Sequence, residues 1–135
     1  MSRWLPLLLC LMALDALADQ ASWKDYVIHY TTLPSTLIPA DVAAAHDIVR
    51  ADDRIIINIT VRRNEAAVAA RVTRHVTNLL NQLVAIDFRE ITEPGAVYYL
   101  GSHRVDERET LRFDLDIRPD GEEDSFNLKF LRKFY

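Results

Sequence analysis

The residues of this chain best suited to bind a metal are four histidines, spread over 135 residues. They are His29, His46, His75 and His103, and no two of them stand at a spacing typical of a metal site. A shared site would require the fold to bring them together, and surface or capping roles suit them better. We therefore expect no metal site and no cofactor.

Acidic residues gather in two short segments, 106–109 and 122–124. Loop carboxylates are the ligands that calcium prefers. However, Arg108 interrupts the first segment, and neither segment has the spacing of a known calcium loop. Solvated turns explain both segments better.

Three residues on two expected strands are candidates for binding. Asn58 begins the triplet Asn58-Ile59-Thr60, which matches an N-glycosylation acceptor, although an outward polar pair on a strand is the simpler interpretation. Tyr98 and Tyr99 are adjacent, so on a strand they point to opposite faces. We expect one ring in the core and the other exposed or in a groove, where an aromatic side chain can anchor a partner.

Arg112 is the fourth candidate for binding. It begins an Arg-Asp-Asp-Arg series on the polar face of residues 112–118. Such a face could bind a charged ligand. It could equally form cross-strand ion pairs, which we consider the better interpretation.

No catalytic motif is present, so we expect the protein not to be an enzyme. Ser35 and Ser102 lack the glycine-flanked turn of a nucleophilic serine. The three glycines, Gly95, Gly101 and Gly121, are too dispersed for a phosphate-binding loop. The net charge of −4 gives no electrostatic reason to bind nucleic acid or an anionic membrane.

The elements that position these residues follow a period of two, because apolar and polar residues alternate through most of the chain. Turn signals such as Pro94-Gly95 separate the alternating segments. The pattern predicts an all-β, immunoglobulin-like antiparallel β-sandwich of about seven strands. The expected strands are residues 26–30, 54–63, 69–79, 84–89, 96–101, 111–118 and 126–131.

The connection from Thr31 to Asp53 is too long for a structureless loop. Within it, Pro39 precedes an early aspartate and a run of good helix formers that ends at Ala45. We therefore predict one short helix in this loop, capping one end of the sandwich.

Residues 1–18 read as a signal peptide. Arg3 is followed by an apolar run from Leu5 to Leu14, and the segment ends in Ala16-Leu17-Ala18. The run is too short for a membrane span, and Leu9 is too large to precede a lipid-modified Cys10. Cleavage leaves residues 19–135 as a single domain without cysteine or methionine, and therefore without a disulfide.

Several short motifs are spread along the chain, at residues 25–30, 35–39, 78–82, 88–91, 98–101, 110–114 and 129–135. Together they resemble the family named domain of unknown function 4426. The resemblance covers nearly all of residues 19–135 and implies export to the periplasm of a Gram-negative bacterium. It carries no activity or catalytic residues.

These observations favour a periplasmic, non-catalytic binding module that engages a protein or an envelope component, without a membrane span after signal cleavage. Sheet edges and end loops are the surfaces that sandwiches offer for such contacts. The alternative is a small-ligand or metal-ion carrier, which requires the histidines and carboxylates to converge.

Overall fold

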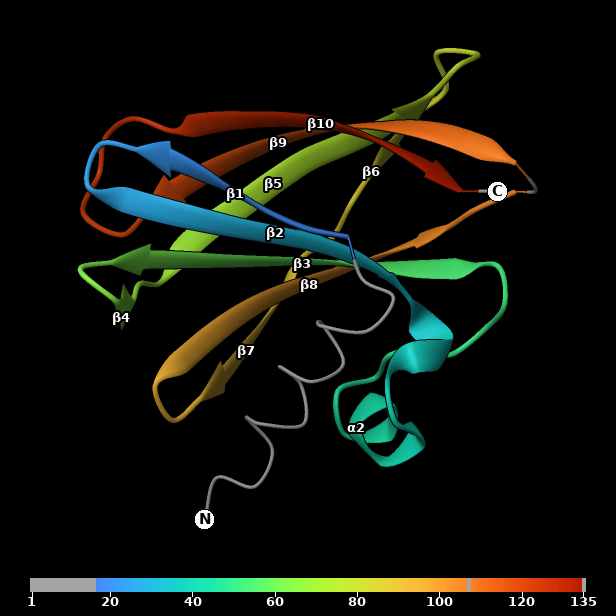
Figure 1. The fold of residues 1–135 in the computed structure, drawn as a ribbon, viewed down its shortest axis with the longest axis horizontal. Helices are drawn as coiled ribbons and strands as arrows, with labels where there is room; N and C mark the ends of the chain where they lie inside the picture. Colours follow the sequence, from blue (N-terminus) through green and yellow to red (C-terminus); the bar gives the residue numbers. More distant parts are fainter. Residues whose placement is uncertain (1–16, 107, 135) are drawn as a thin grey trace.

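The computed structural model describes residues 17–106 and 108–134. Two antiparallel sheets pack face to face (Figure 1), which confirms the predicted immunoglobulin-like sandwich architecture. The predicted signal peptide lies outside the described residues, apart from Leu17 and Ala18. Among the described residues, no helix has both the length and the apolar composition needed to cross a membrane.

The first sheet, sheet A, has the strand order β1–β2–β3–β8–β7, and the short β4 also pairs with β3. All of its neighbouring pairs are antiparallel. Its strands are β1 (Leu17–Trp23), β2 (Tyr26–Pro34), β3 (Arg54–Arg63), β4 (Ala66–Ala67), β7 (Arg89–Glu93) and β8 (Ala96–Arg104).

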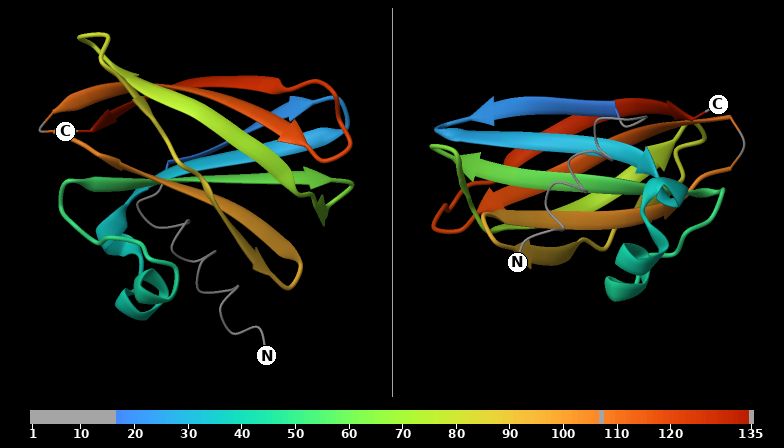
Figure 2. Two further views of the ribbon diagram at one scale, coloured as in Figure 1. Left: turned by 180° about the vertical axis from the view of Figure 1, so that it is seen from behind. Right: turned by 60° about the horizontal axis from the view of Figure 1, so that its bottom comes forward.

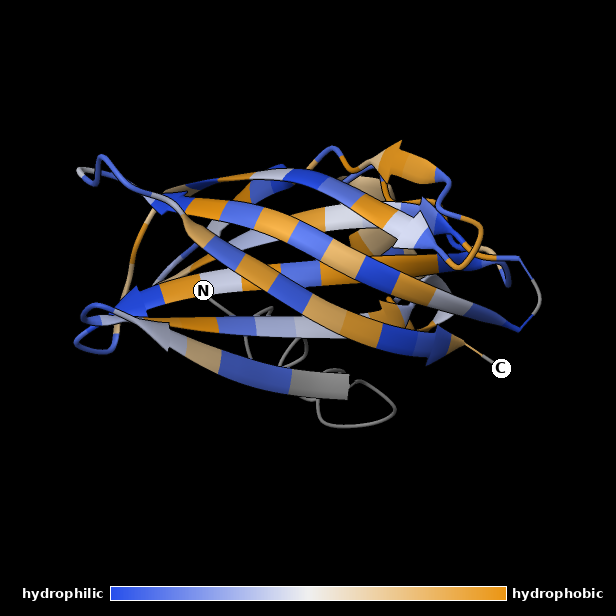
Figure 3. Ribbon diagram, turned by 90° about the horizontal axis from the view of Figure 1, so that it is seen from above, coloured by the Kyte–Doolittle hydropathy of each residue, from blue (hydrophilic) through white to orange (hydrophobic). Residues whose placement is uncertain are grey.

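The second sheet, sheet B, has the order β10–β9–β5–β6 and is also antiparallel. Along its strands hydrophobic and hydrophilic residues alternate (Figure 3), as expected when one face is buried and the other is solvated. Its strands are β5 (Ala70–Asn78), β6 (Leu83–Ala85), β9 (Glu109–Pro119) and β10 (Phe126–Phe134).

The strand count differs from the sequence-based prediction, because ten strands lie within residues 17–106 and 108–134 instead of seven. Strands β1 and β4 were not expected. The segment predicted as one strand over residues 84–89 is divided between β6 in sheet B and β7 in sheet A. The chain crosses from one sheet to the other between these strands (Figure 2, left), so a single continuous strand cannot form there.

The core fills the space between the two inner faces. Ile28, Ile57 and Ile59 of sheet A, and Leu115 and Ile117 of sheet B, have no exposed surface. Burial of a side chain of this size contributes about 1.5–3 kcal/mol. Because these residues alternate along their strands, the period-two pattern identified the buried faces correctly.

The long connection after β2 forms a 3₁₀ turn, η1 (Ser35–Leu37), and the helix α2 (Ala40–Ala45), which confirms the predicted short helix. Ile38 and Ala43 of this connection pack against Leu33 and Ile56 of sheet A. The helix therefore covers one part of the outer face of sheet A, and the rest of that face contains the first candidate site.

Candidate functional sites on the two outer faces

The fold places the four binding candidates from the sequence on three different surfaces. Asn58 and Tyr98 belong to the outer face of sheet A. Tyr99 points between the sheets, where 4% of its surface is exposed. Arg112 is exposed on the outer face of sheet B. The four residues therefore do not form one site.

Tyr99 is held in place by hydrogen bonds at both sides of its hydroxyl group. The hydroxyl accepts a hydrogen bond from the Ala70 amide at 2.7 Å and donates one to Glu90 Oε1 at 2.7 Å. Burial, as the largest cause, raises the pKa of Tyr99 to about 12. These contacts link the start of β5 in sheet B to β7 and β8 in sheet A.

Sheet A divides at one end of β3. The pairing of β3 with β8 ends at Ile59 and Tyr99. Beyond that point Arg62 and Arg63 of β3 pair with β4 instead. Strand β8 begins three residues before Tyr99, at Ala96, and there it pairs only with β7. The strands β3 and β8 therefore form a fork, and they diverge toward the β4 end in Figure 1.

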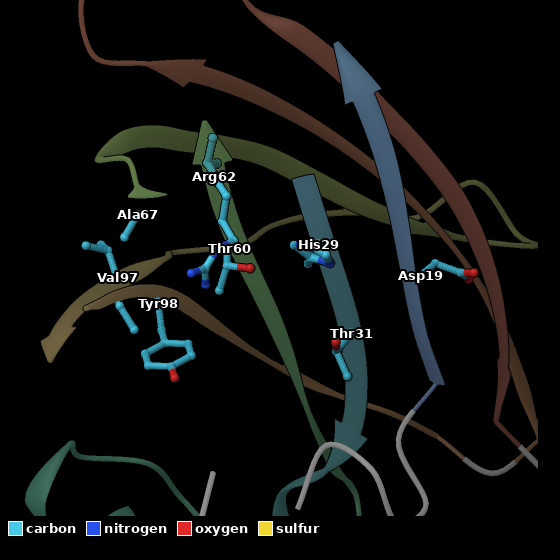
Figure 4. Close-up of a pocket in the computed structure, with 10 residues that line it drawn as sticks. Asp19, His29, Thr31, Thr60, Arg62, Ala67, Val97 and Tyr98 are labelled. Atoms are coloured by element: carbon cyan, nitrogen blue, oxygen red, sulfur yellow. The ribbon is translucent and has the colours of Figure 1, made fainter. Parts of the chain in front are cut away.

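A pocket of about 370 Å³ lies on the outer face at this fork; we call it the fork pocket. Figure 4 shows Arg62 and Thr60 beside the Tyr98 ring, with His29 and Thr31 on the neighbouring strand β2. The volume lies near the lower end of the range of roughly 300–1,000 Å³ typical of small-molecule sites. Its lining residues are Asp19, His29, Thr31, Thr60, Val61, Arg62, Ala67, Ala96, Val97 and Tyr98.

Of the two charged residues that line the fork pocket, Asp19 has an ion-pair partner and Arg62 has none among the described residues. Asp19 is bound by Arg132, whose Nη2 lies 3.0 Å from Asp19 Oδ2. Arg62 has no carboxylate partner among the described residues and donates a hydrogen bond to the Glu65 carbonyl at 2.9 Å. Burial and the charge of Arg62 lower the pKa of His29, so its imidazole is neutral at neutral pH.

The second candidate surface is an apolar region on sheet B. We call it the leucine patch and define it as Leu79, Leu80, Leu83 and Leu131, whose exposed fractions are 62%, 79%, 60% and 48%. Leu79 and Leu80 lie in the turn between β5 and β6. The strand register places Leu131, Arg112, Thr77 and Leu83 in one row across the four strands.

Side-chain hydrogen bonds hold the turn that contains Leu79 and Leu80 in one conformation. The Asn78 side chain accepts hydrogen bonds from the Leu80 and Gln82 amides, at 2.9 and 3.0 Å, and its amide group donates one to the Gln82 side chain at 2.6 Å. Asn81 adopts a left-handed backbone with φ of 60°, which asparagine tolerates well. The exposed leucines are therefore fixed by a specific turn, which projects at the end of β5 in Figure 1.

Arg112 borders a hollow of about 480 Å³ beside the leucine patch. No acidic side chain of the described residues pairs with its guanidinium, whereas Arg74 lies 3.5 Å from Asp114 and 3.7 Å from Asp116. The expected ion pairs therefore form on this face without Arg112. The charged and polar residues that line the hollow include His75, Asp114 and Lys129.

The histidines and the acidic segments do not converge. Within residues 17–106 and 108–134, no group of three His, Cys, Asp or Glu residues could hold a metal ion. Glu122 instead binds Lys24 at 2.7 Å and accepts a hydrogen bond from the Tyr26 hydroxyl at 3.0 Å. Glu109 accepts a hydrogen bond from the Asp106 amide at 2.8 Å. These contacts stabilise the turns that contain the acidic residues.

Sequence reasoning missed most of the residues at both surfaces. The period of two places Thr60 and Arg62 on the same face as Asn58, but only the strand register brings His29 beside them, opposite Thr60. At the leucine patch a signal was present, because Leu79 and Leu80 stand next to the turn residues Asn81-Gln82.

Comparison with known proteins places the chain in one family. The profile of the domain of unknown function DUF4426 matches residues 20–135. A crystal structure of a DUF4426 family protein from Pseudomonas aeruginosa PAO1 is similar, with 26% sequence identity and a TM-score of 0.81. The similarity covers 87% of this chain and 94% of that chain. No curated protein matches the sequence.

Two structures of FetP from uropathogenic Escherichia coli share the fold at much lower identity. A copper-bound variant has 7% identity and a TM-score of 0.65, over 89% of this chain and 97% of that chain. FetP as isolated has 8% identity and a TM-score of 0.62, over 90% and 97%. At these identities the similarity concerns the fold alone.

Proposed function

Because the chain belongs to the DUF4426 family, whose function is unknown, we propose that it is a non-catalytic module that binds a partner protein. The binding surface is the leucine patch, with Arg112 beside it. The module works in the periplasm, where the apolar segment at residues 1–18 would direct it.

The distribution of exposed apolar side chains carries this proposal. Six large hydrophobic residues of the described chain are exposed, and all except Val49 lie in the same region of sheet B. Four belong to the β5–β6 hairpin, and Leu131 lies in the same cross-strand row as Leu83 of that hairpin. Single exposed leucines are ordinary on protein surfaces, but a group of them on a fixed turn is typical of an interaction site.

Arg112 strengthens the same interpretation. Arginine is one of the residues that most often contribute a large share of the binding energy in protein interfaces. Since its guanidinium has no acidic partner among the described residues, it is available for a carboxylate of the bound protein. The neighbouring hollow gives room for such a side chain.

The proposed function does not include copper binding. One FetP structure is copper-bound, but the likeness to FetP is one of fold, and within residues 17–106 and 108–134 no group of three His, Cys, Asp or Glu residues could hold a metal ion. The metal-ion carrier hypothesis therefore has no specific observation in its favour.

The proposal is tested by site-specific photo-crosslinking in living cells. A photoreactive residue at position 80 is compared with one at position 49, because Val49 is the exposed hydrophobic residue outside the patch. We expect a discrete crosslinked species from position 80 and none from position 49. Equal labelling at the two positions would show nonspecific contact and would contradict the proposal.

Substitutions then measure the energy of the contact. Leu79→Ser combined with Leu80→Ser is expected to lower the crosslinking yield about tenfold or more, because burial of each leucine contributes about 1.5–3 kcal/mol. Val49→Ser is the matched control and should leave the yield unchanged. Far-ultraviolet circular dichroism of both variants establishes that each remains folded.

A further inference from the structure

The fork pocket is independent of the proposed interface, because it lies on the outer face of the opposite sheet. It arises from the sheet itself. Beyond Ile59, strand β3 no longer pairs with β8 and pairs with β4 instead, while residues Ala96–Tyr98 of β8 pair only with β7. The pocket is therefore a consequence of the strand topology.

Small side chains keep the pocket open. Ala67 of β4 and Ala96 of β8 line it, together with Val97. Tyr98, of which 4% is exposed, packs with Ile91 and Ala96 and so has a fixed position beside the pocket. These residues form an apolar wall that suits a hydrocarbon or aromatic group of modest size.

Hydrogen-bond donors gather at the other side of the pocket. Arg62 has five N–H donors and uses one of them for the Glu65 carbonyl. Thr60 is two residues away on the same strand face, and His29 lies opposite Thr60 in the register of β2 and β3. Figure 4 shows these three side chains next to one another. A cation with two neutral polar groups is a suitable environment for one carboxylate.

The nearby acidic residues leave this positive charge in place. Asp19 is bound by Arg132 at 3.0 Å. Glu93 lies opposite Ala96 on β7 and does not line the pocket. Burial is the largest cause that raises the pKa of Tyr98; the charge of Glu93 raises it further, whereas the charge of Arg62 lowers it. A ligand carboxylate is therefore attracted toward Arg62 and repelled from Glu93. These two charges set the orientation of the ligand in the pocket.

We propose that the fork pocket binds a small monocarboxylate with an apolar body, with the carboxylate on Arg62, Thr60 and His29 and the apolar body against Tyr98 and Ala96. A single cation beside an apolar wall matches one negative charge on an amphipathic molecule. A multiply charged anion would bring more charge than the pocket neutralises.

The test uses the purified protein and two probes of the same shape, 3-phenylpropionate and its neutral amide. Binding is measured by isothermal titration calorimetry, and the contact residues are located by chemical-shift changes of backbone amides. We expect the carboxylate to bind with shift changes at Thr60, Arg62 and Tyr98, and the amide to bind about tenfold more weakly or worse. Equal affinity for both probes, or no binding of either, would overturn the proposal.

Variants separate the charge from the shape of the pocket. Arg62→Gln should weaken carboxylate binding about tenfold to a hundredfold and leave the weak amide binding unchanged. Ala67→Leu should weaken both probes because it fills the pocket. Arg63→Gln is the control, since Arg63 pairs with Asp25 at 3.1 Å and does not line the pocket. An Arg63→Gln effect as large as that of Arg62→Gln would show general charge attraction and contradict a defined site.

Discussion

Gly101 occupies a point on the inner face of β8 where a side chain does not fit. A Cβ atom at this position would lie 2.5 Å from Ile86 Cγ2 and 3.0 Å from Phe88 Cε1. Both neighbours belong to the segment between β6 and β7 that crosses from sheet B to sheet A. The absence of a side chain at Gly101 therefore allows this crossing segment to pack against β8.

Gly101→Ala is expected to destabilise the fold by about 1–3 kcal/mol, the usual cost of overpacking a core. The measurement is the free energy of unfolding in urea. Ser102→Ala is the control, because Ser102 is the exposed next residue of the same strand, and its change should stay within about 0.5 kcal/mol. Equal stability of the two variants would mean that the crossing segment moves away from β8 at little cost.

An ion pair joins strand β1 to sheet B, in addition to the packing of Trp23 against Phe126. Arg132 of β10 contacts Asp19 at 3.0 Å, donates a hydrogen bond to Thr32 Oγ1 at 3.3 Å and lies over the rings of Tyr30 and Phe130 at 5.7 and 4.9 Å. Its side chain is 10% exposed. The arginine thus joins the edge strand of sheet A to the edge strand of sheet B.

Arg132→Gln should cost about 1–3 kcal/mol, because it removes charged hydrogen bonds and the cation–π contacts together. Amide hydrogen exchange within β1 should become faster, while exchange in β3 changes less. The matched control is Arg104→Gln, which breaks an ion pair of similar length, 2.9 Å to Asp53, with an arginine that is 72% exposed. That loss should be about 0–1 kcal/mol. A larger loss of unfolding free energy for Arg104→Gln than for Arg132→Gln would contradict the role assigned to Arg132 in joining the two edge strands.

The elements that the sequence predicts are those whose pattern is local. Alternation identified β3 and β9 with their buried faces, and Pro39 with the following alanines identified α2. Strand β1 was missed because its first residues continue the apolar segment read as a signal. Alternation from Val84 to Arg89 continues through the crossing between sheets, and a period of two does not encode which sheet a strand joins.

The candidate surfaces show the same limit. Of the four binding candidates only Tyr98 lines the fork pocket, and the fork that creates this pocket is a consequence of β4 pairing with β3. Two residues in β4 give too little pattern to predict that pairing. Surface sites built by strand register therefore require the three-dimensional structure, whereas the buried faces do not.

The whole molecule is expected to lose stability in two separate acidic ranges. Burial lowers the pKa of His29 and of His103 below the ordinary value of 6.5. The charge of Arg62 lowers the pKa of His29 further. The charges of Glu109 and Asp106 raise the pKa of His103 and so partly offset its burial. The unfolded chain then binds more protons than the native protein below pH 6.5, so the free energy of unfolding falls there as pH falls. Hydrogen bonds from Lys24 and Tyr26 lower the pKa of Glu122 from 4.5, and that contribution is lost only below pH 4.5.

Combined His29→Gln and His103→Gln substitutions separate the two ranges. The double variant should show a flatter dependence of unfolding free energy on pH between 6.5 and 4.5, because the two groups that charge on unfolding are gone. Below pH 4.5 its slope should match that of the parent protein, since Glu122 is retained. Urea unfolding at a series of pH values provides the measurement. An unchanged slope between pH 6.5 and 4.5 would show that both imidazoles protonate in the native protein as readily as in the unfolded chain.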